Sequence, residues 1–156
     1  MNLTVTNLQK RHKIRLPAIH GLANFFLAKS GKRTGIEWGE VSVALVNNRK
    51  SKEINRLHLG HDYPTDVISF NFSAIPGQSG GVEDGELVIN VELAARLGSI
   101  YWSQDHELAL YLAHGCDHLS GANDNTPSRR QQMRRRELRW LKDAKLQGLD
   151  LNLLST

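Results

Sequence analysis

Two histidines have the spacing of a metal site, in the segment LAHGCDHLSGAND at residues 112–124. His114 and His118 are four residues apart, so on a helix their side chains project from one face on successive turns. Asp124 follows after Gly121, a residue that allows the chain to turn back sharply. Zn²⁺ accepts imidazole and carboxylate ligands, and three protein ligands leave a fourth position for water. The spacing therefore predicts a zinc site formed by His114, His118 and Asp124.

The same segment also allows simpler interpretations. A pair of histidines one helical turn apart is often only packed or exposed, without any metal. Gly115 lies between the two histidines, where glycine costs about 1 kcal/mol relative to alanine, and this indicates the close approach of another element. Asp117 is rotated away from the two histidines, so we expect it to be a partner of the site or a surface charge. Zinc proteases carry H-E-x-x-H, and glycine replaces that glutamate here, so their route of peptide hydrolysis is not expected.

Charge is divided into three blocks along the chain. Residues 1–56 carry 11 Lys and Arg against 3 Asp and Glu, residues 57–128 carry 1 against 10, and residues 129–156 carry 8 against 3. Such runs are common on solvated helix faces, but basic segments also attract phosphate chains. The alternation favours a polyanionic partner. The predicted contacts are arginines on the outer face of the last helix: Arg134, Arg135, Arg136 and Arg139.

Periodicity and capping signals place the elements that must position these residues. We expect strands at residues 3–6, 41–46, 66–72 and 86–90, the last after a glycine-rich loop at 76–85. We expect helices at 17–31, 50–57, 91–98 and 103–120, and a final helix from 126 onward. Ser103 and Thr126 are good N-cap residues for the last two helices. The predicted fold is α+β, with about four strands in a mixed sheet, about five helices, and a metal site on a helix and its following loop; the strand order stays open.

Length and composition restrict the class of protein. A chain of 156 residues is expected to form one domain, spanning residues 1–156. Hydrophobic residues at 40% and charged residues at 23% exclude a disordered chain. Cys116 is the single cysteine, which excludes disulfides and four-thiolate zinc clusters and favours a reducing compartment. No apolar run approaches the roughly 20 residues of a membrane span, and the first residues lack the apolar part of a signal peptide. The expected location is the cytoplasm.

Three ordered segments at residues 64–70, 85–87 and 114–124 read PTDVISF, GEL and HGCDHLSGAND. Together they resemble the YbeY family of bacterial metalloproteins of ribosomal RNA maturation, whose segments read PTDVLSF, G-D/E-I and H-G-x-L-H-L-x-G-Y-D-H, with aspartate last in some members. The resemblance covers about residues 45–140, where His106, Met133 and Glu137 also fit. The chain departs from the family pattern at Leu59, Asp117, Ala122 and Asn123, where the family usually has arginine, leucine, tyrosine and aspartate.

The resemblance implies a zinc-dependent endoribonuclease of single-stranded RNA. The family acts in maturation of the 3′ end of 16S ribosomal RNA and in ribosome quality control, so the implied partner is the small ribosomal subunit. One zinc ion would be held by the three residues named above. The resemblance also implies that the strand at 66–72 lies beside the metal cleft, with Asp66 and Ser69 as possible cleft residues. A strand cap and a solvent-facing position are the alternative interpretation of that pair.

Two other functions remain open from the sequence. The first is a metal-stabilised RNA- or ribosome-binding assembly factor with little catalysis, which Leu59 favours. The second is a zinc hydrolase of another ester or amide, which the basic flanks disfavour. His58 and His61 precede the PTDVISF strand, and we expect both to be surface residues.

Overall fold

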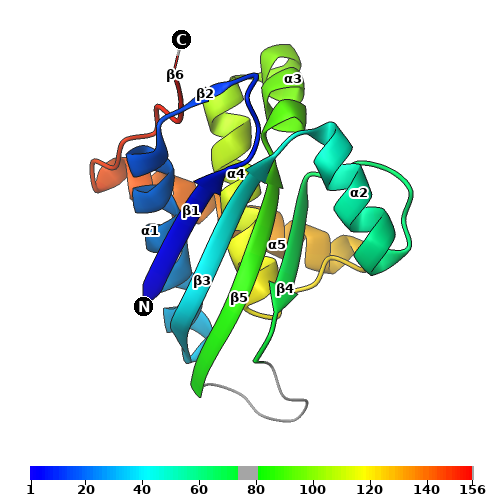
Figure 1. The fold of residues 1–156 in the computed structure, drawn as a ribbon. Coiled ribbons are helices and arrows are strands. Elements are labelled where there is room, and N and C mark those ends of the chain that lie inside the picture. Colours follow the sequence, from blue (N-terminus) through cyan, green and yellow to red (C-terminus); the bar gives the residue numbers. More distant parts are fainter. Residues whose placement is uncertain (74–80, 156) are drawn as a thin grey trace.

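A twisted four-stranded sheet backed by helices forms the body of the molecule (Figure 1). The computed structural model describes residues 1–73 and 81–155. The strands are β1 (Asn2–Asn7), β2 (Lys13–Ile14), β3 (Ile36–Val46), β4 (Val67–Asn71), β5 (Gly81–Asn90) and β6 (Leu154–Ser155). The helices are α1 (Leu16–Thr34), α2 (Asn48–Leu59), α3 (Val91–Tyr101), α4 (Gln104–Leu119) and α5 (Pro127–Leu146). This confirms the expected α+β fold with five helices among the described residues.

The sheet is mixed, with the strand order β1-β3-β5-β4. β3 pairs in parallel with both β1 and β5, whereas β4 pairs antiparallel with β5 and forms an edge. β2 and β6 form a separate antiparallel pair of two residues each, which the sequence pattern did not predict. The antiparallel edge strand β4 begins directly after Asp66, so the topology brings this residue to the rim of the sheet.

The two faces of the sheet are covered unequally. Alternate residues of β3 and β5 point to the main core, where α1 and α4 pack behind the sheet (Figure 1). On the opposite face a smaller cluster of Val46, Ile68 and Val88 packs against Ile54 of α2. The predicted inward residues of α5 lie in or against the main core: Met133, Trp140, Leu141 and Ala144 are all buried. None of the helices within the described residues is long and apolar enough to cross a membrane.

β3 and β5 both begin earlier than expected, because polar residues near their starts conceal the pattern. Trp38 is buried on β3, and its indole Nε1 donates to the Leu27 carbonyl oxygen at 2.9 Å. Asp84 of β5 accepts from the Glu40 backbone N–H at 2.7 Å, next to a register shift between Trp38 and Val41. Of the predicted glycine-rich loop, residues 76–80 lie outside the described residues, and residues 81–85 belong to β5.

Gly115 allows α4 to lie directly on β4 and β5. A Cβ atom at this position would lie 2.9 Å from Val67 Cγ1 and 3.2 Å from the nearest Leu87 methyl carbon. The close approach predicted from this glycine is therefore present, and its partner is the sheet. Because Gly115 lies between His114 and His118, this contact sets the distance of both histidines from β4.

Candidate metal centre

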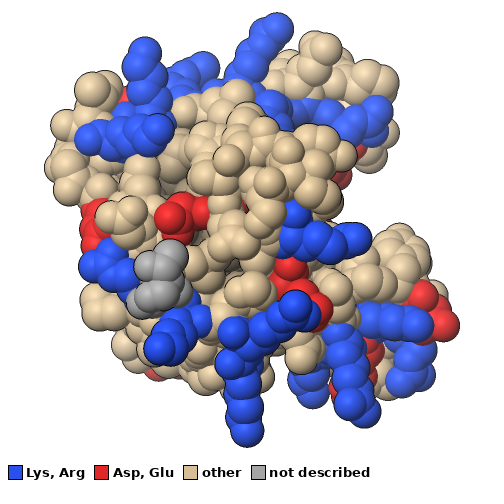
Figure 2. All heavy atoms as spheres, turned by 90° about the horizontal axis from the view of Figure 1, so that it is seen from above, with Lys and Arg blue, Asp and Glu red and all other residues tan. Residues whose placement is uncertain are grey.

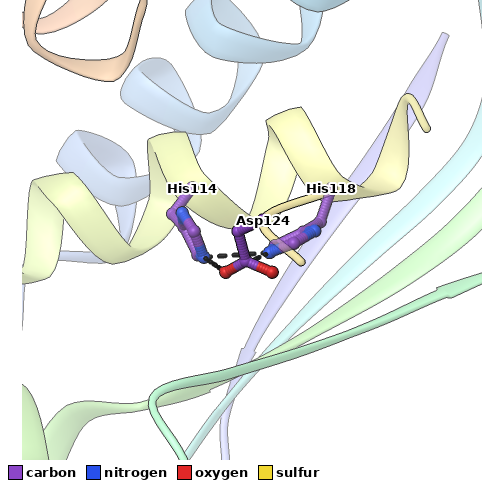
Figure 3. A group of neighbouring side chains, drawn as sticks. All are labelled: His114, His118 and Asp124. Atoms are coloured by element: carbon purple, nitrogen blue, oxygen red, sulfur yellow. Dashed lines mark hydrogen bonds and ion pairs between the residues drawn. The ribbon is translucent and has the colours of Figure 1, made fainter. Parts of the chain in front are cut away.

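His114, His118 and Asp124 converge on one point, with the carboxylate beside both imidazoles (Figure 3). The two Nε2 atoms lie 2.9 Å apart. Asp124 Oδ2 lies 3.7 Å from His114 Nε2 and 3.5 Å from His118 Nε2. One ligand atom from each residue lies within 4.8 Å of the others, which makes this a group that could hold a metal ion. The structure thus assembles the three residues that the spacing singled out.

A helix and the turn after it bring the three ligands together. Ser103 caps the start of α4 by accepting from the His106 N–H at 3.0 Å, as predicted, and the histidines follow on successive turns. Gly121 has a φ of +104°, a left-handed conformation that favours glycine. Its N–H donates to the His118 carbonyl oxygen at 2.9 Å, so the chain reverses at once. This reversal returns Asp124 to the histidine face.

Both imidazoles are oriented by acceptors on their Nδ1 atoms. His118 Nδ1 donates to the Ala122 carbonyl oxygen at 2.9 Å, and His114 Nδ1 donates to Glu137 Oε1. A carbonyl can only accept, so neutral His118 carries its proton on Nδ1 and leaves a lone pair on Nε2. Glu137 imposes the same tautomer on His114. Two lone pairs that face each other beside a carboxylate repel unless a cation lies among them, so this donor set fits a divalent metal.

The electrostatic surroundings of His114 favour positive charge at this point. Burial is the largest single influence on the pKa of the imidazole and lowers it, whereas the hydrogen bond and the charge of Glu137 raise it. The carboxylates of Asp66 and Asp124 act in the same direction, and the net result is a raised pKa. The site therefore stabilises a cation on this ring, whether proton or metal.

Two of the three candidate ligands, His114 and Asp124, line an open cleft with a volume of about 580 Å³. Acidic groups and His114 line one part of it, and basic and amide side chains of α5 line the rest: Arg130, Gln131, Arg134 and Arg135. A second hollow of about 290 Å³ shares Asp66, His114 and Glu137 with this cleft and is extended by leucines and Tyr111. Seen from above, Lys and Arg side chains stand on both sides of a notch in the molecular surface (Figure 2).

Asp66 and Ser69 occupy different places on β4. Asp66 lines the cleft, and its Oδ1 also accepts from the Val67 N–H at 2.7 Å and the Thr65 hydroxyl at 3.2 Å. It is therefore both a strand cap and a cleft residue. Ser69 alternates with Val67 and Asn71 on the face that packs against α4, where Asn71 Nδ2 donates to the Leu119 carbonyl oxygen at 3.1 Å. Ser69 is half-buried there and is not among the residues that line the cleft.

Asp117 differs from the expectation, because it is neither a partner of the metal ligands nor a surface charge. Its side chain is fully buried, and both carboxylate oxygens accept from Arg136 Nε at 3.0 Å. Arg33 Nη2 lies 3.4 Å from Asp117 Oδ1. The carboxylate thus connects α4 to α1 and α5. Helical spacing predicts that Asp117 points away from the face that carries the two histidines. It does not predict which residues Asp117 contacts on the other side.

The prediction that Arg136 lies on the outer face of α5 is wrong. Its side chain is only 20% exposed and is held by Asp117, so it does not project freely into solvent. Arg134 and Arg135 line the metal cleft, and Arg139 is exposed further along the helix. The helical pattern places all four arginines outside the apolar stripe, but the buried carboxylate draws one of them inward.

Glu137 is the site residue that the periodicity of α5 conceals. It is buried and reaches His114 across the helix interface. Only the family resemblance pointed to this residue. One signal was present in the sequence: an acidic residue at the same spacing as Met133, Trp140 and Leu141 lies on the apolar face of the helix and requires a buried partner.

His58 and His61 are exposed, as expected, and neither belongs to the group of converging ligands. His58 packs edge-on against Phe70 with ring centroids 5.5 Å apart. His61 stacks on Tyr63 at 5.4 Å.

Comparison with known proteins supports the identification suggested by the three motifs. The family described as Endoribonuclease YbeY matches residues 4–145. A protein of that name from Rhodopirellula baltica is 39% identical over 122 residues, which cover 76% of this chain and 59% of the relative. Further proteins of that name come from Parabacteroides distasonis, 32% identical over 82% of this chain and 88% of the relative, and Geobacter sulfurreducens, 30% identical over 88% and 93%.

A solved structure shares the fold. The solution structure of TM1509 from Thermotoga maritima superposes with a TM-score of 0.57 at 18% identity, covering 94% of this chain and 93% of that protein. The family match begins within β1 and ends in the last turn of α5, so it includes every element that positions His114, His118 and Asp124. This chain belongs to the YbeY endoribonuclease family.

Proposed function

We propose that this protein is a zinc-dependent endoribonuclease that cuts single-stranded RNA. The observation that carries the proposal is the convergence of two Nε2 atoms and Asp124 Oδ2 beside a cleft that His114, Asp124 and several arginines line. Family membership supports RNA as the substrate, because the relatives are named endoribonucleases.

The donor set supports zinc as the ion. Two imidazole nitrogens and one carboxylate oxygen match the ligands of catalytic zinc sites, which keep an open position. His114, His118 and Asp124 would hold the ion, and Glu137 and the Ala122 carbonyl would orient the imidazoles. A bound zinc ion supplies Lewis acidity, since it lowers the pKa of water to about 7 and withdraws charge from a phosphate oxygen.

The protein's own side chains divide the remaining work between them. Arg134 and Arg135 face the cleft and are placed to bind the negatively charged RNA backbone, with Arg139 as an outer contact on the same helix. Asp66 lies in the cleft outside the ligand set and can accept a hydrogen bond or proton from the substrate. The cleft is open to solvent, and the extended backbone of a single strand can follow its basic wall.

The biological setting belongs to the same proposal. The substrate that we infer is the 3′ end of 16S ribosomal RNA, presented by the small ribosomal subunit in the cytoplasm during maturation and quality control. The motifs that resemble the YbeY family support this inference, and so do the basic segments on either side of the acidic middle. The single thiol of Cys116, buried in α4, is compatible with a reducing compartment.

A second candidate is an assembly factor that binds RNA with little catalysis. Leu59 supports it, because this residue stands at the end of α2, 51% exposed, where the family usually has arginine. In that case the metal stabilises the fold, and RNA binding continues without cleavage.

The test is metal analysis of the purified protein followed by an RNA cleavage assay. We expect one equivalent of zinc and cleavage of an end-labelled single-stranded RNA that stops with a chelator and returns when zinc is added. Addition of magnesium or manganese instead distinguishes the ion. Cleavage that continues in a fully metal-free protein contradicts the proposal. Zinc-loaded protein that binds the RNA and never cuts it establishes the second candidate.

A further inference from the structure

A further pocket, separate from the two hollows at the candidate metal centre, lies against the loop that leads to Asp124. It has a volume of about 400 Å³. Its walls come from the end of α1, the loop after α4 and the first turns of α5: Arg33, Thr34, Ser120, Gly121, Ala122, Asn123, Arg129, Gln132, Met133 and Arg136. No acidic side chain is among these described lining residues.

The pocket carries an excess of positive charge. Arg33 and Arg136 share the single carboxylate of Asp117, which is fully buried beneath them. Within the part of the chain that the structure describes, the Arg129 side chain donates to two neutral oxygens, Asn123 Oδ1 at 3.1 Å and Asn125 Oδ1 at 3.2 Å, and to no carboxylate. Three guanidinium groups therefore stand against one carboxylate. Partly exposed arginines with an unbalanced charge in a concave surface attract an anion, and their planar fork matches phosphate oxygens.

The pocket and the metal cleft share one loop. Ala122 lines the pocket, and its carbonyl oxygen holds His118 Nδ1. Arg129 and Arg130 are neighbours on α5: the first lines the pocket, and the second lines the metal cleft and donates to the Asp124 carbonyl oxygen at 3.2 Å. A polyanionic strand that continues beyond Arg130 can therefore reach the pocket that Arg129 lines.

We propose that this pocket binds a backbone phosphate of the same single-stranded RNA, beyond the nucleotides that occupy the metal cleft. This inference rests on the proposed function and extends it from the cleft to the adjoining surface. Arg33 and Arg129 are the phosphate contacts, and Arg136 is held in place by Asp117. Because the pocket lies outside the cleft, we expect a short RNA bound in the cleft to leave it empty and a longer strand to fill it.

The test measures affinity as a function of strand length. Zinc-loaded protein is titrated into fluorescent 2′-O-methyl oligouridylates, a tetranucleotide and a dodecanucleotide, and anisotropy gives each Kd. We expect Arg33→Gln and Arg129→Gln each to weaken binding of the dodecanucleotide about 10-fold. The slope of log affinity against log salt should fall by about 0.7 for each phosphate that a variant no longer binds. Binding of the tetranucleotide should change by less than about 2-fold, because the loss of a surface charge that does not contact the ligand has only a small effect.

Lys32→Gln is the matched control, since it removes a positive charge from the neighbouring exposed position of α1, outside the pocket. It should weaken binding of the dodecanucleotide much less than Arg33→Gln does. Arg129 has no buried partner among residues 1–73 and 81–155, so Arg129→Gln decides the matter if Arg33→Gln unfolds. Zinc content is checked for every variant.

Equal losses for both strand lengths, no loss at all, or an equal loss in Lys32→Gln overturn the inference. The proposed function fails separately, if the parent protein does not cut RNA in a chelator-sensitive manner.

Discussion

Glu137 holds the ring of His114, the residue that we propose as a metal ligand, although it lies outside the group of converging ligands. This carboxylate is 1% exposed as a residue and binds the Nδ1 side of the ring, opposite the Nε2 that faces Asp124. Such a partner fixes the tautomer and the ring orientation and makes the ligand more basic. The orientation of His114 therefore depends on a residue of α5 that lies 23 residues further along the chain.

Glu137→Leu should raise the Kd for zinc by roughly 10- to 100-fold, because His114 loses the acceptor that orients it. Glu137→Gln should lose less, since an amide oxygen still accepts from Nδ1 but carries no charge. Competitive titration against a chelator measures both values. Asp143→Asn, on the same helix and away from the site, serves as control. Equal affinity in the parent and the leucine variant contradicts a role for Glu137.

His106 contributes a pH dependence to folding. Its Nε2 is buried without a hydrogen-bond partner among the described residues. Burial lowers the pKa of this imidazole below 6.5, with Lys145 and Arg134 adding to the effect and Glu107 opposing it. The unfolded chain therefore binds a proton at a higher pH than the folded chain does. Stability must then fall as pH decreases from about 6.5 toward the lowered pKa.

Chemical denaturation at several pH values, with chelator present throughout, measures this contribution. The free energy of unfolding of the parent should fall more steeply between about pH 7 and pH 5 than that of His106→Leu, which has no group to titrate here. Parallel curves for the two proteins show that His106 keeps its ordinary pKa.

At the scale of elements, the Asp117 cluster holds three helices in register. A buried carboxylate on α4 bound by Arg136 of α5 and Arg33 of α1 keeps the ligand helix beside the helix that carries Glu137. Removing one partner of a buried ion pair leaves an uncompensated charge. Removing Asp117 should therefore lower the free energy of unfolding by more than the net contribution of the ion pair to stability.

Asp117→Ala should destabilise the protein by about 3–5 kcal/mol, measured by urea denaturation. Lys29 and Asp143 offer a matched comparison, because they also join α1 to α5, at 3.0 Å, but both are about one-third exposed. Asp143→Ala should cost no more than about 1 kcal/mol. Similar losses in the two variants contradict the structural role of Asp117.

The elements were predictable where local signals act alone, and less so where partners are distant. The caps Ser103 and Thr126, and the turn at Gly121, were legible in the sequence because each depends on neighbouring residues. The strand order and the early start of β5 depend on pairing across the sheet, which leaves no local pattern.

The candidate site divides in the same way. His114, His118 and Asp124 lie within eleven residues of one another, so spacing was sufficient. The burial of Asp117 and the inward turn of Arg136 depend on contacts between helices. The sequence therefore predicted Arg136 at the surface, and Asp117 either there or as a partner of the site.

For the whole molecule, acidic and basic segments of the chain meet at the cleft that His114 and Asp124 line. The acidic middle of the chain supplies Asp66 and Asp124, and the basic final segment supplies the opposite wall of the cleft. In the proposed function, this positive wall would draw the RNA toward the ion.

Replacing both Arg134 and Arg135 by alanine should weaken RNA binding and reduce its dependence on salt. The slope of log affinity against log salt should decrease by about 0.7 for each phosphate that the arginines no longer neutralise. Lys142→Ala, an exposed position further along α5, is the control. Zinc content is measured in parallel because Arg134 Nη1 lies 3.8 Å from Glu137 Oε2. An unchanged slope shows that these arginines are only solvated.

The most direct measurement of the central claim follows zinc and RNA cleavage together in two substitutions of Asp124. Asp124→Ala should lose both, because two imidazoles alone hold the ion poorly. Asp124→His should keep both at neutral pH, since imidazole can occupy the same position, and should lose zinc at a higher pH than the parent because histidine must be neutral to bind. Retention of a full equivalent of zinc and undiminished cleavage in Asp124→Ala would contradict the claim that these three side chains form the catalytic metal site.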